Sequence, residues 1–360
     1  MATCRRVEWP LVLAAVGMLG CSTSSDHDES DPDGGGPAAD AAIAPDGGAG
    51  LKVDLQQTSV SGLSSGAFMA VQFHVAFSSI TQGAAIFAGG PFDCAQGSLT
   101  SALVACGDAL DAPDVTPLIA LTKQWASAGY LDDVTNLARQ RVFLFGGADD
   151  MTVNPVVMDA LATYYEAFLP PQSISYESRF PGAGHTMPTL DYGNPCSVTE
   201  TPWIGKCAYD GAGTALAQIY GPLAPAASSA TGKILSLSQA SFIADPASHS
   251  LADTAYVYVP TSCAGGETCR LHVAFHGCSQ EATGQAGTAF YMNAGYNPWA
   301  DTNHIVVVYP QTIVSASNPE ACWDWWGYDS PDYAKKTGPQ MAMVRAMLDY
   351  LASSPAPDGG

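Results

Sequence analysis

The stretch SVSGLSSGAFMA, residues 59–70, decides the predicted fold, because it contains the motif G-x-S-x-G at residues 62–66. A β-leaning run precedes the motif at residues 53–60, and a helical pattern of apolar residues follows it. The motif presents a nucleophilic serine when it lies between a strand and a helix, since small flanking residues let the turn hold the serine in a strained conformation. We therefore predict that Ser64 is a nucleophile and that the backbone N–H of Ser65 is one oxyanion donor.

A plain glycine-rich turn is the alternative for this stretch. The chain contains 36 glycines, so a bare G-x-S-x-G arises easily by chance, and only the strand and helix around it favour the nucleophile. His74 follows on the predicted helix, where we expect a packing or surface residue and not the catalytic base.

A serine hydroxyl needs a base, and the base needs an acid that orients it. Residues 141–145, RVFLF, predict a short strand, and a glycine turn with Asp149 and Asp150 follows it. Such turns after strands are where α/β-hydrolases carry the triad carboxylate. Asp150, with glycine three residues before it and valine three after it, fits that loop better than Asp149. Two acids in an ordinary polar turn are the structural alternative.

The candidate base lies in the next loop. Residues 174–180 predict another strand, and PGAGHTMP follows at residues 181–188. A histidine in this glycine-rich loop, His185, is poorly explained as a core residue and is typical of a mobile, accessible base; a solvated loop histidine is the alternative. The chain order Ser64, Asp150, His185 is the order of α/β-hydrolases.

The position of the second oxyanion strand is unusual. An ordinary hydrolase carries this strand, ending in His-Gly, before the nucleophile, yet here a buried-strand run ending in HGC occurs at residues 271–278, LHVAFHGC. Residues 305–311, IVVVYPQ, predict the next strand, and residues 337–352 predict a helix with one apolar face. In an unpermuted hydrolase that helix leads into the nucleophile strand. We therefore predict a single α/β domain, a circularly permuted α/β-hydrolase.

Composition excludes one class of partner. The 360 residues carry 34 acidic and 13 basic side chains, which gives a formal net charge of −21 and a pI near 4.3. Nucleic-acid binding needs a basic stripe that tracks phosphates, so we expect no nucleic-acid partner. Apolar residues make up 47% of the chain, which is enough for a large core and excludes disorder of the whole chain.

Residues 1–21 have the parts of an export signal. Arg5 and Arg6 supply positive charge, an apolar run follows, and the ending MLGC looks like a bacterial lipobox with Cys21 as the lipidated residue. A plain signal peptide is the alternative, and both predict an exported protein, either extracellular or a cell-surface lipoprotein. Residues 22–50, rich in Gly, Pro, Asp and Ser, predict a flexible linker. Residues 51–352 then form the catalytic domain and residues 353–360 a flexible tail.

Eight cysteines follow the predicted signal: Cys94, Cys106, Cys196, Cys207, Cys263, Cys269, Cys278 and Cys322. An even number in an exported chain predicts disulfides, but eight cysteines allow 105 pairings and the sequence does not choose among them. Short loops favour 94–106, 196–207 and 263–269, which leaves 278–322. The spacing is not typical of a zinc site, and we expect no metal and no organic cofactor.

Five stretches carry a family resemblance: SGLSSGAFMAVQFHVAFS, AGGPFDCAQGS, PGAGHTMPT, VAFHGCSQ and CWDWWGY. Together they resemble the circularly permuted catalytic domain of extracellular polyhydroxybutyrate (PHB) depolymerases, over nearly all of residues 51–352. The resemblance implies hydrolysis of poly(3-hydroxybutyrate) or related polyesters by the three triad candidates. It also implies that the backbone N–H groups of Ser65 and Cys278 form the oxyanion hole, with His276 in a structural role.

The stretch CWDWWGY, residues 322–328, has three tryptophans within four positions. Aromatic side chains are usually core. Three so close together cannot all face one core from a strand or helix, so we expect at least one to be exposed. The resemblance implies that this loop lines the substrate crevice, and we predict that Trp323 or Trp325 contacts substrate. A bond between Cys278 and Cys322 would tie the loop beside the oxyanion hole.

Larger members of that family carry a linker and a polymer-binding domain after the catalytic domain, whereas this sequence ends in SSPAPDGG. We therefore expect weaker attack on crystalline polymer. We expect a polyester substrate, a membrane contact only through the N-terminal lipid, and a monomer. Three alternatives stay open: an esterase acting on feruloylated or acetylated polysaccharide, a non-catalytic surface lipoprotein that binds polymer, and a serine peptidase.

Overall fold

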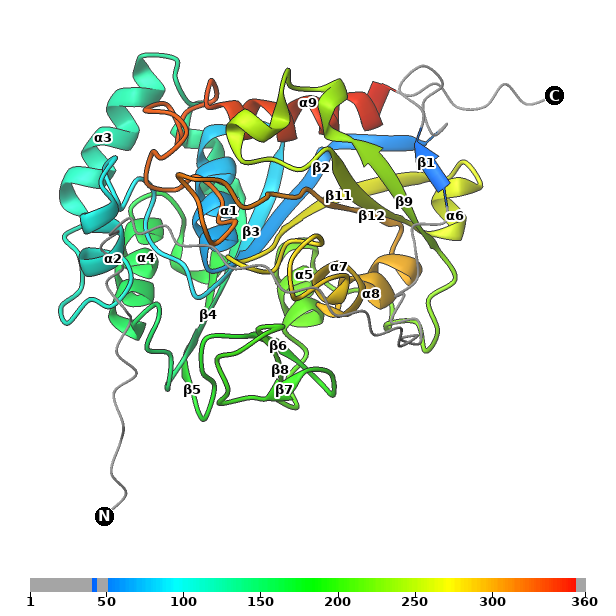
Figure 1. Cartoon of the computed structure of the whole chain (residues 1–360), viewed down its shortest axis with the longest axis horizontal. Helices are drawn as coiled ribbons and strands as arrows, with labels where there is room; N and C mark the ends of the chain where they lie inside the picture. Colours follow the sequence, from blue (N-terminus) through cyan, green and yellow to red (C-terminus); the bar gives the residue numbers. More distant parts are fainter. Residues whose placement is uncertain (1–40, 44–50, 354–360) are drawn as a thin grey trace, which may run out of the picture. The chain divides into compact units, whose positions relative to one another are not determined.

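The computed structural model describes residues 41–43 and 51–353 (Figure 1). The predicted signal segment with Cys21, most of the predicted linker and residues 354–360 of the predicted tail lie outside the described residues. No helix within the described ranges is both long and apolar enough to cross a membrane.

A nine-stranded sheet forms the centre of the described structure (Figure 1). In spatial order its strands are β1 (Ala41–Ile43), β9 (Lys233–Ser238), β10 (Thr254–Val259), β12 (Ile305–Tyr309), β11 (Thr268–Phe275), β2 (Lys52–Leu63), β3 (Thr81–Phe87), β4 (Arg141–Gly147) and β5 (Ile174–Phe180). Only β10 runs antiparallel to its neighbours; the remaining neighbours pair in parallel. The strand β2, which ends one residue before Ser64, therefore lies in the middle of the sheet.

Helices cover both faces of the sheet and bury two apolar clusters against it. One cluster contains residues of α1 (Ser65–Ala76), α3 (Thr116–Ser127), α4 (Pro155–Glu166) and α9 (Pro339–Ser353). The other contains residues of α5 (Gly211–Tyr220), α7 (Ala289–Asn293) and α8 (Tyr296–Thr302). Burial on both faces explains why strands such as IVVVY of β12 are apolar throughout, without the alternation of a half-exposed strand.

Shorter elements lie in the connections. A second sheet has the order β6 (Met187–Thr189), β8 (Ile204–Lys206) and β7 (Asn194–Pro195). The connections also hold α2 (Leu99–Ala105), α6 (Thr261–Ala264) and the 3-10 helices η1 (Val134–Arg139), η2 (Pro171–Ser173), η3 (Gln239–Ser241) and η4 (Pro246–His249). The small sheet follows β5 directly and carries the loop that contains His185.

The elements predicted around the candidate site are present with shifted ends. The nucleophile strand, the strands before Asp150 and His185, the strand at 305–309 and the C-terminal helix all form. The predicted strand at residues 271–278 differs, because β11 ends at Phe275 and HGC lies in a loop. In addition, Ala41–Ile43 of the predicted linker form β1 beside β9, a strand that the alanine-rich sequence does not indicate.

Four disulfides connect the described chain: Cys94–Cys106, Cys196–Cys207, Cys263–Cys269 and Cys278–Cys322. Three close short loops, and these are the pairs that loop length favours in the sequence. The fourth joins the loop after β11 to the tryptophan-rich loop. Disulfides of this number are typical of proteins that fold in an oxidising compartment.

Candidate active site

Ser64 occupies a sharp turn between β2 and α1. Its φ of 57° and ψ of −126° are unusual for a residue with a side chain, and its N–H donates to Phe87 O at 3.0 Å. The glycines of the motif are required by space: a Cβ on Gly62 would lie 2.1 Å from Gly66 O, and one on Gly66 would lie 2.3 Å from His276 O. This geometry is a nucleophile elbow, and it leaves the Ser64 side chain partly exposed.

Asp150 lies in the turn after β4 and is almost fully buried, with 2% of its surface exposed. Its Oδ1 accepts from the backbone N–H groups of Thr152 and Val153, each at 2.9 Å. Its Oδ2 lies 2.9 Å from Nδ1 of His185. The neighbouring Asp149 is exposed. Of the two acids in the turn, the structure therefore brings Asp150 to the histidine.

His185 lies in the loop after β5, but it is buried and its backbone is hydrogen-bonded, in contrast to the accessible position that the sequence suggests. Only 4% of its surface is exposed, and its N–H donates to Oγ1 of Thr199 at 3.0 Å. The flanking backbone is held too, by Gly184 N–H to Cys196 O and by Met187 N–H to Trp203 O. The small sheet and the loop around Cys196 fix this histidine, and the sequence gives no local sign of that support.

The three candidate triad residues follow β2, β4 and β5, which run parallel within the sheet. The carboxyl ends of parallel strands meet at one edge, so the three side chains belong to the same edge of the sheet. A hydrogen bond joins Asp150 to His185, while within the described residues no hydrogen bond joins Ser64 to His185. A carboxylate on Nδ1 is the arrangement that would orient a histidine base and leave its Nε2 for a proton from the nucleophile.

Two backbone segments meet beside Ser64. The close approach of Gly66 to His276 O and Phe275 O puts the start of α1 against the end of β11. On the other side, a Cβ on Gly277 would lie 3.3 Å from Cβ of Ser64. The loop with Cys278 therefore starts next to the nucleophile, while the N–H of Ser65 belongs to the first turn of α1, where helices leave such groups unpaired.

His276 is a buried residue that shapes this loop. Its Nδ1 donates to Gly277 O at 2.6 Å, and its Nε2 accepts from the N–H of Thr312 at 3.3 Å. Burial lowers its pKa to about 4, so the ring is neutral at pH 7. Both ring nitrogens are occupied by backbone groups, which fits a structural role.

The tryptophan-rich loop divides its side chains between core and surface. Trp323 is fully buried against Phe275 and His276, so of the two tryptophans predicted as substrate contacts it is the one that the surface does not present. Trp325 is partly exposed and stacks on Phe68 of α1, with ring centroids 4.0 Å apart and planes 15° from parallel. Adjacent aromatics in an irregular loop follow no periodic pattern, which is why the sequence could not separate them.

Asp324, which no pattern in the sequence singled out, shapes the same loop. Its carboxylate accepts from four backbone N–H groups, those of residues 327–330. Burial raises the pKa of Asp324 to about 6. The residue lies between two tryptophans in CWDWW, and a single acid inside an apolar stretch is the signal that could have identified it.

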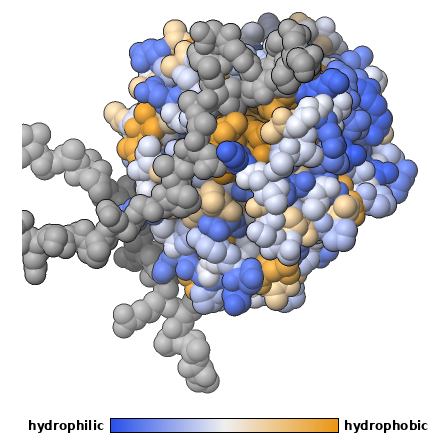
Figure 2. Space-filling model, turned by 90° about the vertical axis from the view of Figure 1, so that its right-hand side faces the viewer, coloured by the Kyte–Doolittle hydropathy of each residue, from blue (hydrophilic) through white to orange (hydrophobic). Residues whose placement is uncertain are grey.

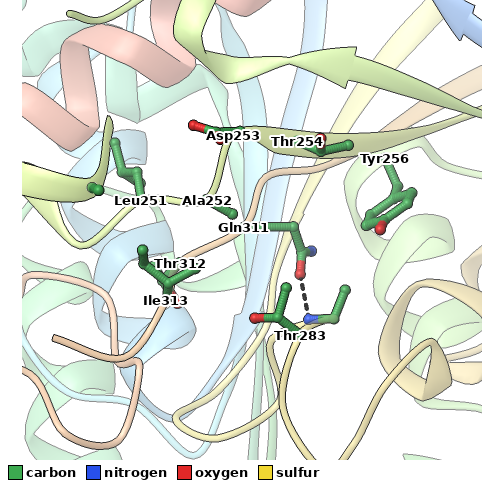
Figure 3. A pocket seen from close by; sticks show the side chains of 11 residues that line it. Leu251, Ala252, Asp253, Thr254, Tyr256, Thr283, Gln311, Thr312 and Ile313 are labelled. Carbon is green, nitrogen blue, oxygen red and sulfur yellow. Dashed lines mark hydrogen bonds between the residues drawn. The ribbon is translucent and has the colours of Figure 1, made fainter. Parts of the chain in front are cut away.

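A hollow of about 330 Å³ lies between the loops that follow β11 and β12 and the start of β10 (Figure 3). Leu251, Tyr256, Thr283 and Ile313 line it, and Thr312 connects it to His276. Gln311 crosses it to accept from the N–H of Ala282 at 2.8 Å, the bond drawn in Figure 3. Within residues 41–43 and 51–353, no group of three or more His, Cys, Asp or Glu side chains could hold a metal ion.

Exposed apolar side chains flank the loop of Asp150. Leu99, Leu103 and Val104 of α2 are each more than half exposed, and so is Met151 next to the acid. The two segments touch, since the N–H of Asn154 donates to Gly107 O just after α2. On the face drawn in Figure 2, hydrophobic residues likewise form several separate areas among hydrophilic ones.

No model of a protein family matches the chain, but curated proteins and solved structures are similar to it. The chain is 47% identical over 308 residues to the poly(3-hydroxybutyrate) depolymerase of Delftia acidovorans, and 38% identical over 320 residues to the polyhydroxybutyrate depolymerase of Talaromyces funiculosus. Each alignment covers 84% of this chain, but they cover 61% and 91% of the two relatives. The chain therefore spans about three fifths of the length of the Delftia relative.

Two solved structures are similar over 88% of this chain and 99% of theirs, each with a TM-score of 0.78. One is PHB depolymerase from Penicillium funiculosum, at 36% identity. The other, at 35% identity, is a serine-to-alanine variant of PHB depolymerase complexed with an R3HB trimer.

Proposed function

This chain belongs to the PHB depolymerase family, and we propose that it hydrolyses the ester bonds of poly(3-hydroxybutyrate) or related polyhydroxyalkanoates to oligomers and monomers. Ser64 is the nucleophile, His185 the general base and acid, and Asp150 the residue that orients His185. Ser65 and Cys278 supply the two oxyanion donors through their backbone N–H groups. The alternatives of a carbohydrate esterase, a silent binding protein and a peptidase are not favoured by the relatives.

The observation that carries the proposal is the buried bond between Asp150 Oδ2 and His185 Nδ1, at the same sheet edge as the strained Ser64 turn. A carboxylate on Nδ1 holds the neutral ring in the tautomer with its lone pair on Nε2, which is the form that accepts a proton. An ion pair that only stabilised the fold would need neither the elbow nor the two backbone segments that meet beside it.

The reaction is acyl transfer in two halves. His185 takes the proton of Ser64, and the serine oxygen attacks the ester carbonyl while the N–H groups of Ser65 and Cys278 bind the carbonyl oxygen as it becomes negative. The hydroxyl end of the polymer leaves with the proton from His185. Water, deprotonated by His185, then attacks the acyl-serine and releases the carboxyl end.

We place the substrate chain over Trp325. Its ring is partly exposed and rigid, because it stacks on Phe68, which lies one helical turn after Ser64. The exposed apolar side chains of α2 and Met151 would contact the polymer surface beside the reacting chain. The alternating methyl and ester groups of a polyhydroxyalkanoate suit a surface that is apolar with few charges.

The sheet order supports a circular permutation. The strands β11 and β12 come from the C-terminal half of the chain, yet β11 pairs directly with the nucleophile strand β2 and β12 pairs with β11. The loop that carries Cys278, residues 276–282, is called the oxyanion loop here; it follows β11, and α9 closes the described chain. We take residues 51–352 as the catalytic domain, with the cut between α9 and β2.

We also propose export and an N-terminal lipid on Cys21. Four disulfides in the described chain favour an oxidising compartment. Lipidation would keep a monomeric enzyme at the cell surface, where it meets polymer or oligomers from outside. Metabolic labelling with a fatty acid tests this, since a Cys21→Ser variant should lose the label and be released.

The substrate class is tested by the products. Amorphous poly(3-hydroxybutyrate) granules and a feruloylated or acetylated polysaccharide are incubated separately with the purified protein, and the released acids are identified by mass spectrometry. We expect 3-hydroxybutyrate and its short oligomers from the granules. Release of ferulate or acetate without any hydroxybutyrate would instead assign the site to carbohydrate esters.

A further inference from the structure

Gln280 lies two residues after Cys278 and is 99% buried. Its Oε1 accepts from the N–H of Gly277 at 2.7 Å, and its Nε2 donates to Pro202 O at 2.7 Å and to Trp203 O at 3.3 Å. Its amide therefore uses its acceptor on one loop and both of its donors on another.

The second loop is the one that supports the candidate base. Trp203 O, which accepts from Gln280, also accepts from the N–H of Met187 at 2.9 Å, two residues after His185. Thr199 of the same loop accepts from the N–H of His185 itself. A continuous path of hydrogen bonds, each between 2.7 and 3.3 Å long, thus runs from Gly277 to the histidine loop.

Other anchors hold the oxyanion loop to the sheet, but not to the histidine. His276 is bonded to Thr312, and Ala282 donates to Gln311 across the hollow in Figure 3. Both partners directly follow β12. Among the hydrogen bonds of residues 51–353, only those of Gln280 join the segment 276–282 to the segment 184–207.

We propose that Gln280 is a positioning residue that sets the oxyanion loop against the loop of the catalytic base, an inference that rests on the proposed function. Catalysis needs the oxyanion donors and the base at fixed positions relative to one ester, and errors of about 1 Å cost on the order of 100-fold in rate. The two groups come from segments about ninety residues apart in sequence. Because the other anchors of the oxyanion loop remain, losing Gln280 changes the relative placement of the two loops more than it changes the stability of either.

The chain offers a matched control in Gln140. This glutamine is equally buried and also donates its Nε2 to two backbone carbonyls, Ser78 O at 2.6 Å and Thr81 O at 2.7 Å. Its partners lie just before β3 and at its first residue, at the end of the sheet away from Ser64. Gln280→Met and Gln140→Met each replace a buried amide that donates to two backbone carbonyls with a side chain of similar volume, so the control matches the loss of both donors and differs in distance from the site.

The test is steady-state kinetics of the native protein and both variants on a soluble nitrophenyl ester, with melting temperatures measured in parallel. Gln280→Met should lower kcat by roughly 10- to 100-fold, change KM less than threefold and leave the pH profile of kcat/KM in place, because the bond of His185 to Asp150 is retained. Gln140→Met should keep kcat within twofold. If Gln280→Met does not fold, Gln280→Glu replaces it; this variant keeps the acceptor for Gly277, loses both donors and should show the same fall in kcat.

Three results would overturn the inference: a folded Gln280 variant with native kcat, a loss confined to KM, or an equal loss in Gln140→Met. Failure of the proposed function is distinguishable, because it would appear in the native protein as ester turnover that survives Ser64→Ala. A lack of any turnover in the folded native protein would overturn both.

Discussion

The hydroxyl of Ser65 accepts a hydrogen bond from the backbone N–H of Trp323 at 3.3 Å. Trp323 directly follows Cys322, and Cys322 is bonded to Cys278. A continuous connection therefore runs between the two residues whose N–H groups we propose as oxyanion donors. It ties the start of α1 to the loop after β11, two segments that the sequence separates by more than 200 residues.

This connection predicts that the Cys278–Cys322 disulfide matters for rate as well as for stability. Replacing both cysteines with serine should lower kcat about 10- to 100-fold on a soluble ester, because the donor on Cys278 loses its tether. The 44-residue separation also predicts a stability loss of about 4 kcal/mol, measured by chemical unfolding.

The disulfide Cys263–Cys269 is the control, since it ties α6 to the start of β11. Its removal should cost about 2 kcal/mol, because the separation is only 6 residues, and should leave kcat within twofold. Kinetics are measured at a temperature where circular dichroism shows both variants folded. Equal losses of kcat in the two variants would speak against a tether.

Asp150 and Asp149 provide a test within one turn. Asp150→Asn should lower kcat about 10⁴-fold on a soluble ester, since an amide no longer fixes the reactive tautomer of His185. Asp149→Asn, at an exposed position, should keep kcat within twofold. Comparable activity of the two variants would show that Asp150 does not orient the base.

The two tryptophans should separate binding from stability. Trp325→Ala is expected to raise KM for hydroxybutyrate oligomers roughly tenfold, because it removes the exposed ring stacked on Phe68. Trp323→Ala empties a fully buried site and should instead cost about 3 to 5 kcal/mol of unfolding free energy. Oligomer kinetics and denaturant titrations distinguish the two effects, and an unchanged KM in Trp325→Ala would remove this ring from the substrate path.

The pH dependence of stability should depend on Asp93. Burial raises its pKa to about 6, although the hydroxyl of Tyr333 and the charge of Lys335 oppose the shift. The folded state thus binds this proton more tightly than the unfolded chain, where the pKa is near 3.8. The stability from this group is complete below about pH 4 and is lost as the pH rises through 6, by up to about 3 kcal/mol.

Asp93→Asn is neutral at every pH, so its stability relative to the native protein should improve from pH 4 to pH 7. Denaturant unfolding at the two pH values measures this, with Asp108→Asn as the control at an exposed position. A constant difference between native protein and Asp93→Asn would contradict the raised pKa.

Much of the fold could be predicted from patterns of neighbouring residues in the sequence. The strand, the small residues and the helix around Ser64 are contiguous, and so are the apolar runs of β4 and β12 and the extended run of β5, so the sequence predicts them directly. The strands β3, β9 and β10 were not predicted, because their pairing depends on partners elsewhere in the chain. The same reason applies at the site: Gln280, Thr199 and Phe68 act through residues far away in sequence, and no local pattern marks them.

Solvent exposure was the weaker part of the prediction. The glycines around His185 suggest a mobile loop, but backbone bonds from the small sheet and from Cys196 bury the ring. Trp323 and Trp325 are two residues apart and differ in burial because their loop is irregular. Neither outcome follows from residue type, since burial in a loop is set by tertiary packing.

The decisive measurement is the clearance of amorphous poly(3-hydroxybutyrate) granules by the full chain, followed as turbidity beside a Ser64→Ala variant. We expect the native protein to clear the suspension and the variant, although folded, to clear it 10⁴-fold or more slowly. Clearance by Ser64→Ala at a comparable rate, or no clearance by a native protein that is folded, would contradict it.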